Sequence, residues 1–303
     1  MTVVCLPDSR AREQVGDIPG VKFVIWDGSG EPPPDVRVTE FLVAEYSARV
    51  AGREALAALR ELRVIQLLSA GADPWLPVVP HGVTLCTAQG VHGASTAELA
   101  VAGMLAVLRQ LPQFVRQQDL GRWQRQRGQS LSELNVLVVG AGDVGSRVAA
   151  AVRALDGQVT VLARQARAGV RAFVELPQLL GEHQVVVLTV PLTPQTRGLV
   201  DARFLAAMPD QALLVNVARG PVVHTDALVA ELRTGRLRAF LDVTDPEPLP
   251  PDHPLWRLPG VLLTPHVGGG TPGWAARAYR LVREQISRFR AGEDLVNVVR
   301  EGY

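Results

Sequence analysis

Residues 136–145, with the sequence Val-Leu-Val-Val-Gly-Ala-Gly-Asp-Val-Gly, limit more than any other segment what this chain can fold into. Four consecutive apolar β-formers are typical of a strand that is covered on both faces. The glycines that follow have the spacing G-x-G-x-x-G, and apolar residues then recur at helical spacing at Val144, Val148 and Val152. The sequence therefore predicts a strand, a tight glycine turn and a helix, which is how a Rossmann unit begins.

Each glycine of this turn has a physical task in dinucleotide binding. Gly140 makes the tight turn, Gly142 lets the backbone approach a pyrophosphate, and Gly145 lets the helix pack on the strand. Asp143 and Val144 begin the helix, whose first N–H groups and positive dipole end favour a phosphate. We predict a dinucleotide site at these five residues. A purely structural turn and an adenosyl-methionine site are the alternatives.

The rest of the chain alternates strand-like and helix-like segments, which indicates an α/β fold with mostly parallel sheets. A typical domain has about 100–200 residues, and this chain has 303, so we expect two domains. Strands are expected at 3–6, 21–26, 41–44, 64–68, 83–86, 136–139, 159–162, 185–190, 212–217, 239–241 and 261–263. Helices are expected at 53–60, 144–155, 202–207, 226–234 and 272–290.

Composition excludes several classes of function. The net charge of +1 provides no field that would attract nucleic acid or an anionic membrane, and no apolar run reaches the ~18–20 residues that span a bilayer. Cys5 and Cys86 are isolated, which argues against a disulfide framework and a cysteine zinc site, and no spacing of histidines suggests a metal site. The single lysine, Lys22, argues against a pyridoxal Schiff base. We expect a soluble, cytoplasmic protein.

One predicted helix has no polar face. Ser95 and Glu98 have capping-box spacing and precede residues 99–108, which are apolar almost throughout. Such a helix has to be buried between domains or subunits. Residues 116–132 that follow are rich in Gln and Arg, with Trp123 among them, and suit an exposed connection or arm.

The end of the second nucleotide-domain strand indicates which cofactor binds. Sites for NAD carry Asp or Glu there, about 20 residues past the glycines, for the ribose 2′-hydroxyl. Here the strand leads into Ala163 and Arg164, with Arg167 close behind, and no carboxylate. We therefore expect NADP(H) to be preferred, with NAD(H) possible. The alternative is a pair of solvated arginines.

Three segments near the C-terminus follow predicted strands and carry side chains suited to catalysis. Arg219, Glu247 and His266 lie in these segments, and ligands of open α/β sheets bind at the carboxyl ends of strands. An arginine fork can hold a carboxylate, and a histidine can exchange a proton near neutral pH while a carboxylate fixes its tautomer. The three residues form a plausible catalytic site.

These segments, in this order, resemble the D-isomer-specific 2-hydroxyacid dehydrogenases over nearly the whole chain. The motifs that carry the resemblance are Ser69–Asp73, Gly121-Arg122-Trp123, the glycine turn, Val190–Thr196, Asn216–Gly220, Leu241–Pro248, His253–Trp256 and Thr264–His266. Arg164, with Gly-Arg-Trp and His-Pro-Leu-Trp, is most similar to the glyoxylate/hydroxypyruvate reductase branch. The resemblance implies a Rossmann nucleotide domain, 96–272, and a flavodoxin-like substrate domain made of 1–95 and 273–303, both doubly wound parallel sheets.

The resemblance also implies roles for single residues. Arg219 would hold the substrate carboxylate and keto oxygen, while His266 would protonate the carbonyl oxygen. Glu247 would bond the far nitrogen of His266, and the backbone N–H groups of Ala70 and Gly71 would cradle the carboxylate. On the cofactor side, Asp242 would meet the nicotinamide carboxamide. The other cofactor contacts implied are Pro191, Thr196, Val217, Ala218 and Gly268.

Two departures from the family pattern are visible. Leu131–Asn135 replaces the usual Leu-x-Gly-Lys segment before the first nucleotide-domain strand. His224 stands where the family commonly has Asp, at a position that resembles a helix cap, so we interpret it and His253 as structural.

The predicted function is the reduction of a small 2-keto acid. We also expect a homodimer, because the related enzymes dimerise through the region that holds the apolar helix and the arm. The first alternative is a nucleotide-sensing binding protein, similar to the corepressors that share this fold. A third hypothesis, oxidation of formate or phosphite, would need site groups that cannot be identified in the sequence.

Overall fold

The computed structural model describes residues 1–45 and 52–300. The chain forms two compact units: unit 1 comprises Met1–His92 and Thr271–Tyr303, and unit 2 comprises Gly93–Gly270. The sequence places these divisions at 95/96 and 272/273. Unit 1 is discontinuous, so the chain passes twice between the units, at His92/Gly93 and at Gly270/Thr271.

Unit 1 is built around a parallel sheet. In the described residues its strand order is β2-β1-β3-β4-β5, and every pairing between neighbouring strands is parallel. Its elements are β1 (Thr2–Leu6), α1 (Ser9–Val15), β2 (Val21–Ile25), β3 (Phe41–Val43), α2 (Arg53–Ala57), β4 (Val64–Gln66), β5 (Thr84–Cys86) and α9 (Trp274–Ala291). One sheet face packs on α1 and α9, and the other packs on α2 and the loop that contains Trp75.

Unit 2 is built around a larger parallel sheet. Over residues 93–270 its strand order is β12-β11-β10-β9-β6-β7-β8. Its strands are β6 (Asn135–Val139), β7 (Gln158–Ala163), β8 (Arg171–Ala172), β9 (Val185–Leu188), β10 (Leu213–Asn216), β11 (Arg238–Leu241) and β12 (Val261–Leu263). Its helices are α3 (Gly93–Leu108), α4 (Leu111–Asp119), α5 (Asp143–Ala154), α6 (Leu176–Leu179), α7 (Ala202–Ala207) and α8 (Thr225–Arg233).

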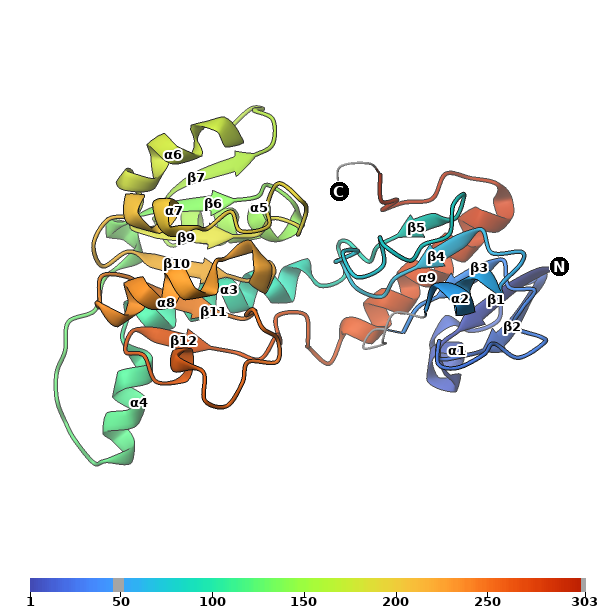
Figure 1. Ribbon diagram of the computed structural model, residues 1–303, viewed down its shortest axis with the longest axis horizontal. Coiled ribbons are helices and arrows are strands. Elements are labelled where there is room, and N and C mark those ends of the chain that lie inside the picture. The colour runs from blue at the N-terminus through green and yellow to red at the C-terminus, as the bar shows by residue number, and fades with distance from the viewer. Residues whose placement is uncertain (46–51, 301–303) are drawn as a thin grey trace. The chain divides into compact units, whose positions relative to one another are not determined.

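Helices cover both faces of the unit 2 sheet. Figure 1 shows α7 and α8 on one face, with α3 and α5 on the other. Alternate strand residues supply the two cores, with Leu137 and Val186 against α6–α8, and Val136 and Val185 against α3 and α5. Because all of these strands are parallel, their carboxyl ends meet at one edge, where ligands of such sheets bind. The predicted fold class, two doubly wound parallel-sheet domains, is confirmed.

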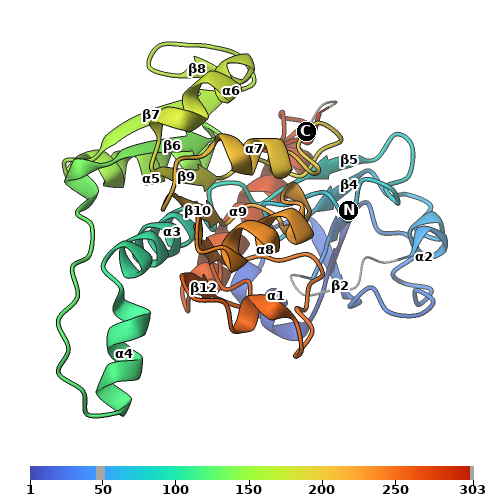
Figure 2. The same cartoon turned by 60° about the vertical axis from the view of Figure 1, so that its left-hand side comes forward.

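One local prediction was wrong and another was incomplete. The capping-box pair Ser95 and Glu98 does not start α3, because the helix begins at Gly93 and Ser95 is buried within it. The exposed arm expected at 116–132 is confirmed, but it begins within a helix that the sequence does not predict: α4 has no buried residue, and extended chain follows it. Figures 1 and 2 both show this arm standing away from the rest of unit 2, and Trp123 in it is 94% exposed. Among the helices within residues 1–45 and 52–300, none combines the length and the apolar character needed to cross a bilayer.

Candidate active site

The predicted glycine turn connects β6 to α5. Gly140 has a φ of +117°, in the left-handed region that favours glycine, and its backbone passes against Thr189. A Cβ at position 145 would overlap the carbonyl oxygen of Gly140, so the first turn of α5 can approach the strand only without a side chain there. Both glycines are therefore required by packing.

The turn fits a dinucleotide pyrophosphate. Gly142 is the N-cap of α5 and makes no side-chain capping bond, and the space where its Cβ would stand is open. The first N–H groups of α5 therefore receive no cap from that side chain, which is the arrangement that binds phosphate at a helix N-terminus. The Oδ1 atom of Asp143 accepts a hydrogen bond from Arg147 Nε at 2.7 Å, and this bond turns one carboxylate oxygen toward an arginine of the same helix.

The segment after β7 places the side chain of Arg167 against the glycine turn. β7 ends at Ala163, and the exposed Arg164 follows it. Arg167 and Val170 then bond each other's backbone in a tight turn, and Arg167 Nη2 donates to the carbonyl oxygen of Ala141 at 3.0 Å. A cationic side chain therefore lies against the turn, in addition to the arginine at the strand end.

A buried asparagine shapes the segment that holds Arg219. Asn216, the last residue of β10, is 1% exposed, and its Oδ1 accepts from the N–H of Ala218 at 3.0 Å. Its Nδ2 donates to the carbonyl oxygen of Arg219, also at 3.0 Å. Gly220 follows, where a Cβ would overlap the backbone of Thr244. The segment after β10 is therefore held close to the one after β11.

Asp242 organises the segment that holds His266. Its carboxylate is 3% exposed and accepts three hydrogen bonds, from Thr264 Oγ1 at 2.6 Å and from the N–H groups of Val267 and Gly268 at 2.9 Å each. The N–H of His266 also donates to the Asp242 carbonyl oxygen at 2.8 Å. The structure thus gives Asp242 a role that the sequence did not reveal, which is to fix the loop after β12. Contact with a nicotinamide carboxamide stays a prediction.

His266 and Glu247 form a close pair. Nδ1 of His266 lies 2.6 Å from Oε1 of Glu247, and both side chains are partly exposed. The hydrogen bond from His266 holds the pKa of Glu247 below its usual value, opposed by partial burial and reinforced by the charges of His266 and Arg219. A carboxylate only accepts hydrogen bonds, so the proton of this bond is on Nδ1, and Nε2 takes no part in it.

The backbone of His266 is strained. Its φ of +52° lies in the left-handed region, which a non-glycine residue rarely adopts. Such strain persists where the surrounding structure imposes it and clusters at functional sites. Here it is imposed by the hydrogen bonds that Asp242 accepts from the backbone N–H groups of His266 and Val267.

The remaining predicted cofactor residues follow the carboxyl ends of β9, β10 and β12. Thr196 Oγ1 donates to the carbonyl oxygen of Pro191 at 2.6 Å, which closes the loop after β9. Val217 and Ala218 are buried directly after β10. Gly268 N–H is bound to Asp242, as described above.

The predicted carboxylate cradle belongs to unit 1. Ala70 is exposed and Gly71 is buried, in the loop that follows β4. Ser69 Oγ donates to the carbonyl oxygen of Gly71 at 3.0 Å, and the buried ring of His92 bonds the carbonyl oxygen of Leu68 at 2.7 Å. The loop is thus tied down on both sides of Ala70.

Three further histidines, all in unit 2, have structural contacts. His253 accepts from the N–H of Leu255, and buried His183 bonds Leu179 and Thr160. His224 stands at the N-cap of α8, as the helix-cap interpretation expects, but its side chain makes no capping bond. Its ring lies beside Gly198, where a Cβ would stand 3.0 Å from Nε2.

The family model for the NAD binding domain of D-isomer specific 2-hydroxyacid dehydrogenases matches residues 101–268, more than half of the chain. The chain belongs to the D-isomer specific 2-hydroxyacid dehydrogenase family. The resemblance seen in the sequence and the predicted enzyme class are thereby confirmed.

Individual relatives cover most of the chain. This dehydrogenase is 35% identical over 244 residues to the glyoxylate reductase/hydroxypyruvate reductase of Mus musculus, which covers 76% of this chain and 74% of that protein. A D-isomer specific 2-hydroxyacid dehydrogenase from Xanthobacter autotrophicus Py2, solved with NADPH and MES, is 30% identical, with a TM-score of 0.84 and coverage of 99% and 98%. An NADPH-dependent glyoxylate/hydroxypyruvate reductase from Sinorhizobium meliloti, solved with NADP and sulfate, is 25% identical, with a TM-score of 0.86 and coverage of 99% and 98%.

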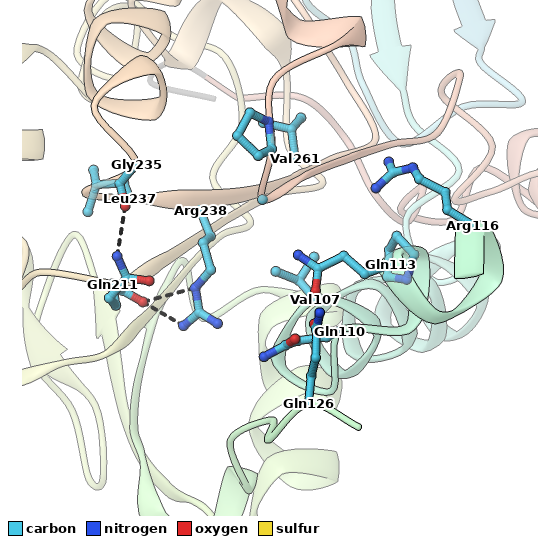
Figure 3. A pocket seen from close by; sticks show the side chains of 13 residues that line it. Val107, Gln110, Gln113, Arg116, Gln126, Gln211, Gly235, Leu237, Arg238 and Val261 are labelled. Atoms are coloured by element: carbon cyan, nitrogen blue, oxygen red, sulfur yellow. Dashed lines mark hydrogen bonds between the residues drawn. The ribbon is translucent and has the colours of Figure 1, made fainter. Parts of the chain in front are cut away.

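A separate pocket lies under the arm of unit 2. It has a volume of about 290 Å³. One wall is formed by residues of α3, α4 and the arm, and the opposite wall includes Arg238 of β11 and Val261 of β12 (Figure 3). Arg238 bonds the Gln211 carbonyl oxygen and Gln129 there, and burial lowers the pKa of its guanidinium. The candidate catalytic residues do not line this pocket.

The Glu247–His266 bond predicts a pH-dependent contribution to stability. A carboxyl whose pKa is lowered by folding stabilises the native state above its unfolded pKa, and this contribution is lost as the pH falls through the folded value. Glu247→Gln should therefore lower Tm at pH 7 and have progressively less effect below about pH 4, since the unfolded glutamate pKa is about 4.3. Thermal melts of both proteins from pH 3 to 8 measure this. A Tm difference that is constant over that range contradicts it.

Proposed function

We propose that this protein reduces small 2-keto acids of the glyoxylate and hydroxypyruvate type to D-2-hydroxy acids, with a nicotinamide dinucleotide. The observation that carries the proposal is the 2.6 Å contact between His266 and Glu247, with the charge of Arg219 acting on the same carboxylate. A general acid, its orienting partner and a cation for an anionic substrate are thus supplied from neighbouring strand ends. The family and its named relatives support the proposal.

The chain's own residues account for binding and for proton transfer. The guanidinium of Arg219 pairs with the substrate carboxylate and polarises the keto oxygen. Nε2 of His266 protonates that oxygen, while Glu247 stabilises the imidazolium through Nδ1–H. The glycine turn would hold the pyrophosphate of a dinucleotide and the loops after β9 and β10 would hold its nicotinamide, which when bound would supply the hydride.

The test is a matrix of initial rates, with NADPH and NADH each against glyoxylate, hydroxypyruvate, pyruvate and phenylpyruvate. We expect turnover with the smaller acids. Dinucleotide binding without turnover of any of the four acids contradicts the proposal and favours the nucleotide-sensing alternative, since a sensor can retain the same three residues.

We infer that NADPH is preferred over NADH. Arg164 follows the end of β7, where a carboxylate for the 2′-hydroxyl is absent, and Arg167 lies against the glycine turn. Two of the structural relatives were solved with NADPH or NADP, which supports the same inference.

Arg219→Lys is expected to damage substrate recognition more than cofactor binding. A lysine provides a point charge in place of a planar fork and cannot hold the carboxylate and the keto oxygen together. Loss of one charge-assisted bond, about 1.5–3 kcal/mol, corresponds to a fall in kcat/KM of roughly 10–150-fold. Steady-state kinetics and NADPH titration measure the two effects separately, with Arg153→Ala as a control on the exposed last turn of α5. An unchanged kcat/KM in Arg219→Lys contradicts the role proposed for the Arg219 guanidinium in substrate recognition.

We also propose that two copies associate through the arm. α4 has no buried residue in the single chain, and Leu111, Val115, Leu120 and Trp123 of this region are at least half exposed. Covering such an apolar surface with its symmetric equivalent stabilises a dimer. Light scattering at micromolar concentration should give twice the chain mass of 32.6 kDa. In Trp123→Arg the measured mass should fall toward that of the monomer. A fully active monomer in the unchanged protein contradicts this.

A further inference from the structure

We propose that the pocket under the arm of unit 2 is a second ligand site, which binds a small, doubly charged oxyanion such as phosphate or a dicarboxylate. Arg238 and Val261, which line the pocket, are the first residues of β11 and β12. The pocket therefore lies at the amino-terminal edge of the parallel sheet, opposite the edge that carries the candidate catalytic residues. The inference goes beyond the proposed function and does not depend on it.

The lining of the pocket carries positive charge. Among the described residues that form it, none is an aspartate or a glutamate, and the polar ones are Gln110, Gln113, Arg116, Gln126, Gln211 and Arg238. Figure 3 shows Arg238 on the sheet side of the pocket and Arg116 on α4. Guanidinium and amide groups donate hydrogen bonds to oxyanions, whereas a metal cation would find no carboxylate ligand there.

Arg238 holds a partly buried charge without a carboxylate partner. Its Nε and Nη2 donate to the carbonyl oxygen of Gln211, at 3.0 and 2.5 Å, and Nη2 also donates to Oε1 of Gln129 at 2.5 Å. Within the described part of the chain, Nη1 makes no hydrogen bond and no carboxylate forms an ion pair with this arginine. Burial lowers the pKa of the guanidinium, and no nearby carboxylate opposes that effect. A bound anion would supply the missing countercharge, which a buried charge requires.

The nearby Arg236 is neutralised by the chain itself. Its Nε donates to Oε2 of Glu231 at 2.6 Å, and its Nη1 lies 3.7 Å from Oδ1 of Asp210. Two carboxylates of unit 2 thus face Arg236, whereas Arg238 contacts only neutral oxygens. The countercharge of Arg238 is therefore expected to come from a ligand.

The walls of the pocket suit a small organic dianion. Arg116 is exposed on α4, and the structure gives its side chain no bond within unit 2 that would hold it away from the pocket. One acid group can therefore pair with Arg238 and a second negative charge with Arg116. The apolar lining residues Val107, Leu237 and Val261 can pack against a short carbon chain.

One wall of the pocket is already fixed before a ligand binds. Gln110 Nε2 donates to the carbonyl oxygen of Arg127 at 2.8 Å, and the N–H of Gln129 donates to that of Leu108 at 2.9 Å. Gly128 lies between these bonds, and a Cβ there would stand 2.8 Å from the Leu108 oxygen. The end of the arm is thus held against the junction of α3 and α4. An anion that bridges Arg238 and Arg116 would fasten α4 to the sheet edge as well.

The site is tested by calorimetric titration of the full chain with inorganic phosphate, succinate or acetate, at about pH 8, where phosphate is mainly the dianion. Ionic strength is fixed, and saturating NADPH blocks phosphate binding at the glycine turn. We expect phosphate or succinate to bind with 1:1 stoichiometry at this site, and the tighter of the two identifies the acid group of the ligand. Acetate, with one charge, should bind more weakly and should not respond to Arg116→Gln.

Two variants and a matched control locate the binding. Arg238→Gln should weaken binding of the dianion roughly 10–150-fold, the effect of losing a charge-assisted bond. Arg116→Gln should weaken it roughly 2–5-fold, as for an exposed ion pair, and cannot disturb the core. Arg233→Gln, which changes an exposed arginine in the last turn of α8 outside the pocket, should have no effect. Hydrogen exchange should show that the dianion protects amides of residues 110–116 in the unchanged protein and not in Arg238→Gln.

Dianion binding that is unchanged in both Arg238→Gln and Arg116→Gln overturns the proposal. If Arg238→Gln fails to fold, Arg116→Gln and the exchange of residues 110–116 decide. Binding that appears only in the Trp123→Arg monomer also overturns it, because a carboxylate from a second copy would then occupy Arg238. A lack of keto-acid reduction contradicts the proposed function and leaves this site unaffected.

Discussion

His266→Ala should lose about 10²–10⁴-fold in kcat while binding NADPH with unchanged affinity. Proton donation by a positioned side chain contributes a factor of that size, and the substitution removes the imidazole that we propose as the proton donor to the keto oxygen. NADPH affinity should be preserved because, within the described part of the chain, the imidazole makes no hydrogen bond to the glycine turn or to α5. His266 instead bonds Glu247 through its ring and Asp242 through its backbone N–H. Single-turnover rates and a fluorescence titration of NADPH measure the two quantities.

His81→Ala is the matched control for this substitution. His81 is exposed in unit 1, so removing it tests whether loss of any imidazole is harmful. Near-normal turnover of His266→Ala would show that the proton comes from elsewhere. An equal loss in kcat and in NADPH affinity would show that the substitution disturbs the fold around β12.

Most strands could be predicted because they are buried on both faces. Runs such as 136–139 and 185–188 contain only apolar β-formers, and no helix of adequate length fits them. The start of α3 could not be predicted in the same way. The local capping signal at Ser95 competes with tertiary packing, since Gly93 begins the helix where only a glycine fits against Asp143. α4 was missed because it buries nothing and so leaves no core-facing pattern to recognise.

The candidate site, like the fold, could be predicted from the sequence only in part. The sequence predicted which side chains follow the strand ends, because glycine spacing and motif order identify them. It could not predict the left-handed backbone of His266, since that conformation is imposed by bonds from Asp242 across 24 or more residues of chain separation. The contact of Arg167 with Ala141 likewise depends on a turn at 167–170 that no local signal specified.

The preference for NADPH is expected to be roughly 10–100-fold in kcat/KM. Charge-assisted hydrogen bonds from arginine to a 2′-phosphate are worth about 1.5–3 kcal/mol each, reduced here by exposure and salt. Arg164 is exposed directly after β7, and Arg167 is held against the glycine turn by its bond to Ala141. Ala163, at the strand end, neither repels a 2′-phosphate nor accepts from a 2′-hydroxyl.

Ala163→Asp/Arg164→Ala should therefore reverse the preference toward NADH, because a carboxylate at the end of β7 accepts from the ribose 2′-hydroxyl and repels the phosphate. Arg167→Ala should reduce the preference for NADPH without reversing it, because Arg164 and the neutral Ala163 remain. Arg153→Ala, on the last turn of α5, changes an exposed arginine at the opposite end of that helix and should leave the ratio unchanged. The measurement is kcat/KM for both cofactors in all four proteins at fixed ionic strength, since screening weakens exposed charge pairs. If the unchanged protein already favours NADH, or if the double substitution leaves the ratio where it was, then Arg164 does not bind the 2′-phosphate, and the end of β7 does not select the cofactor.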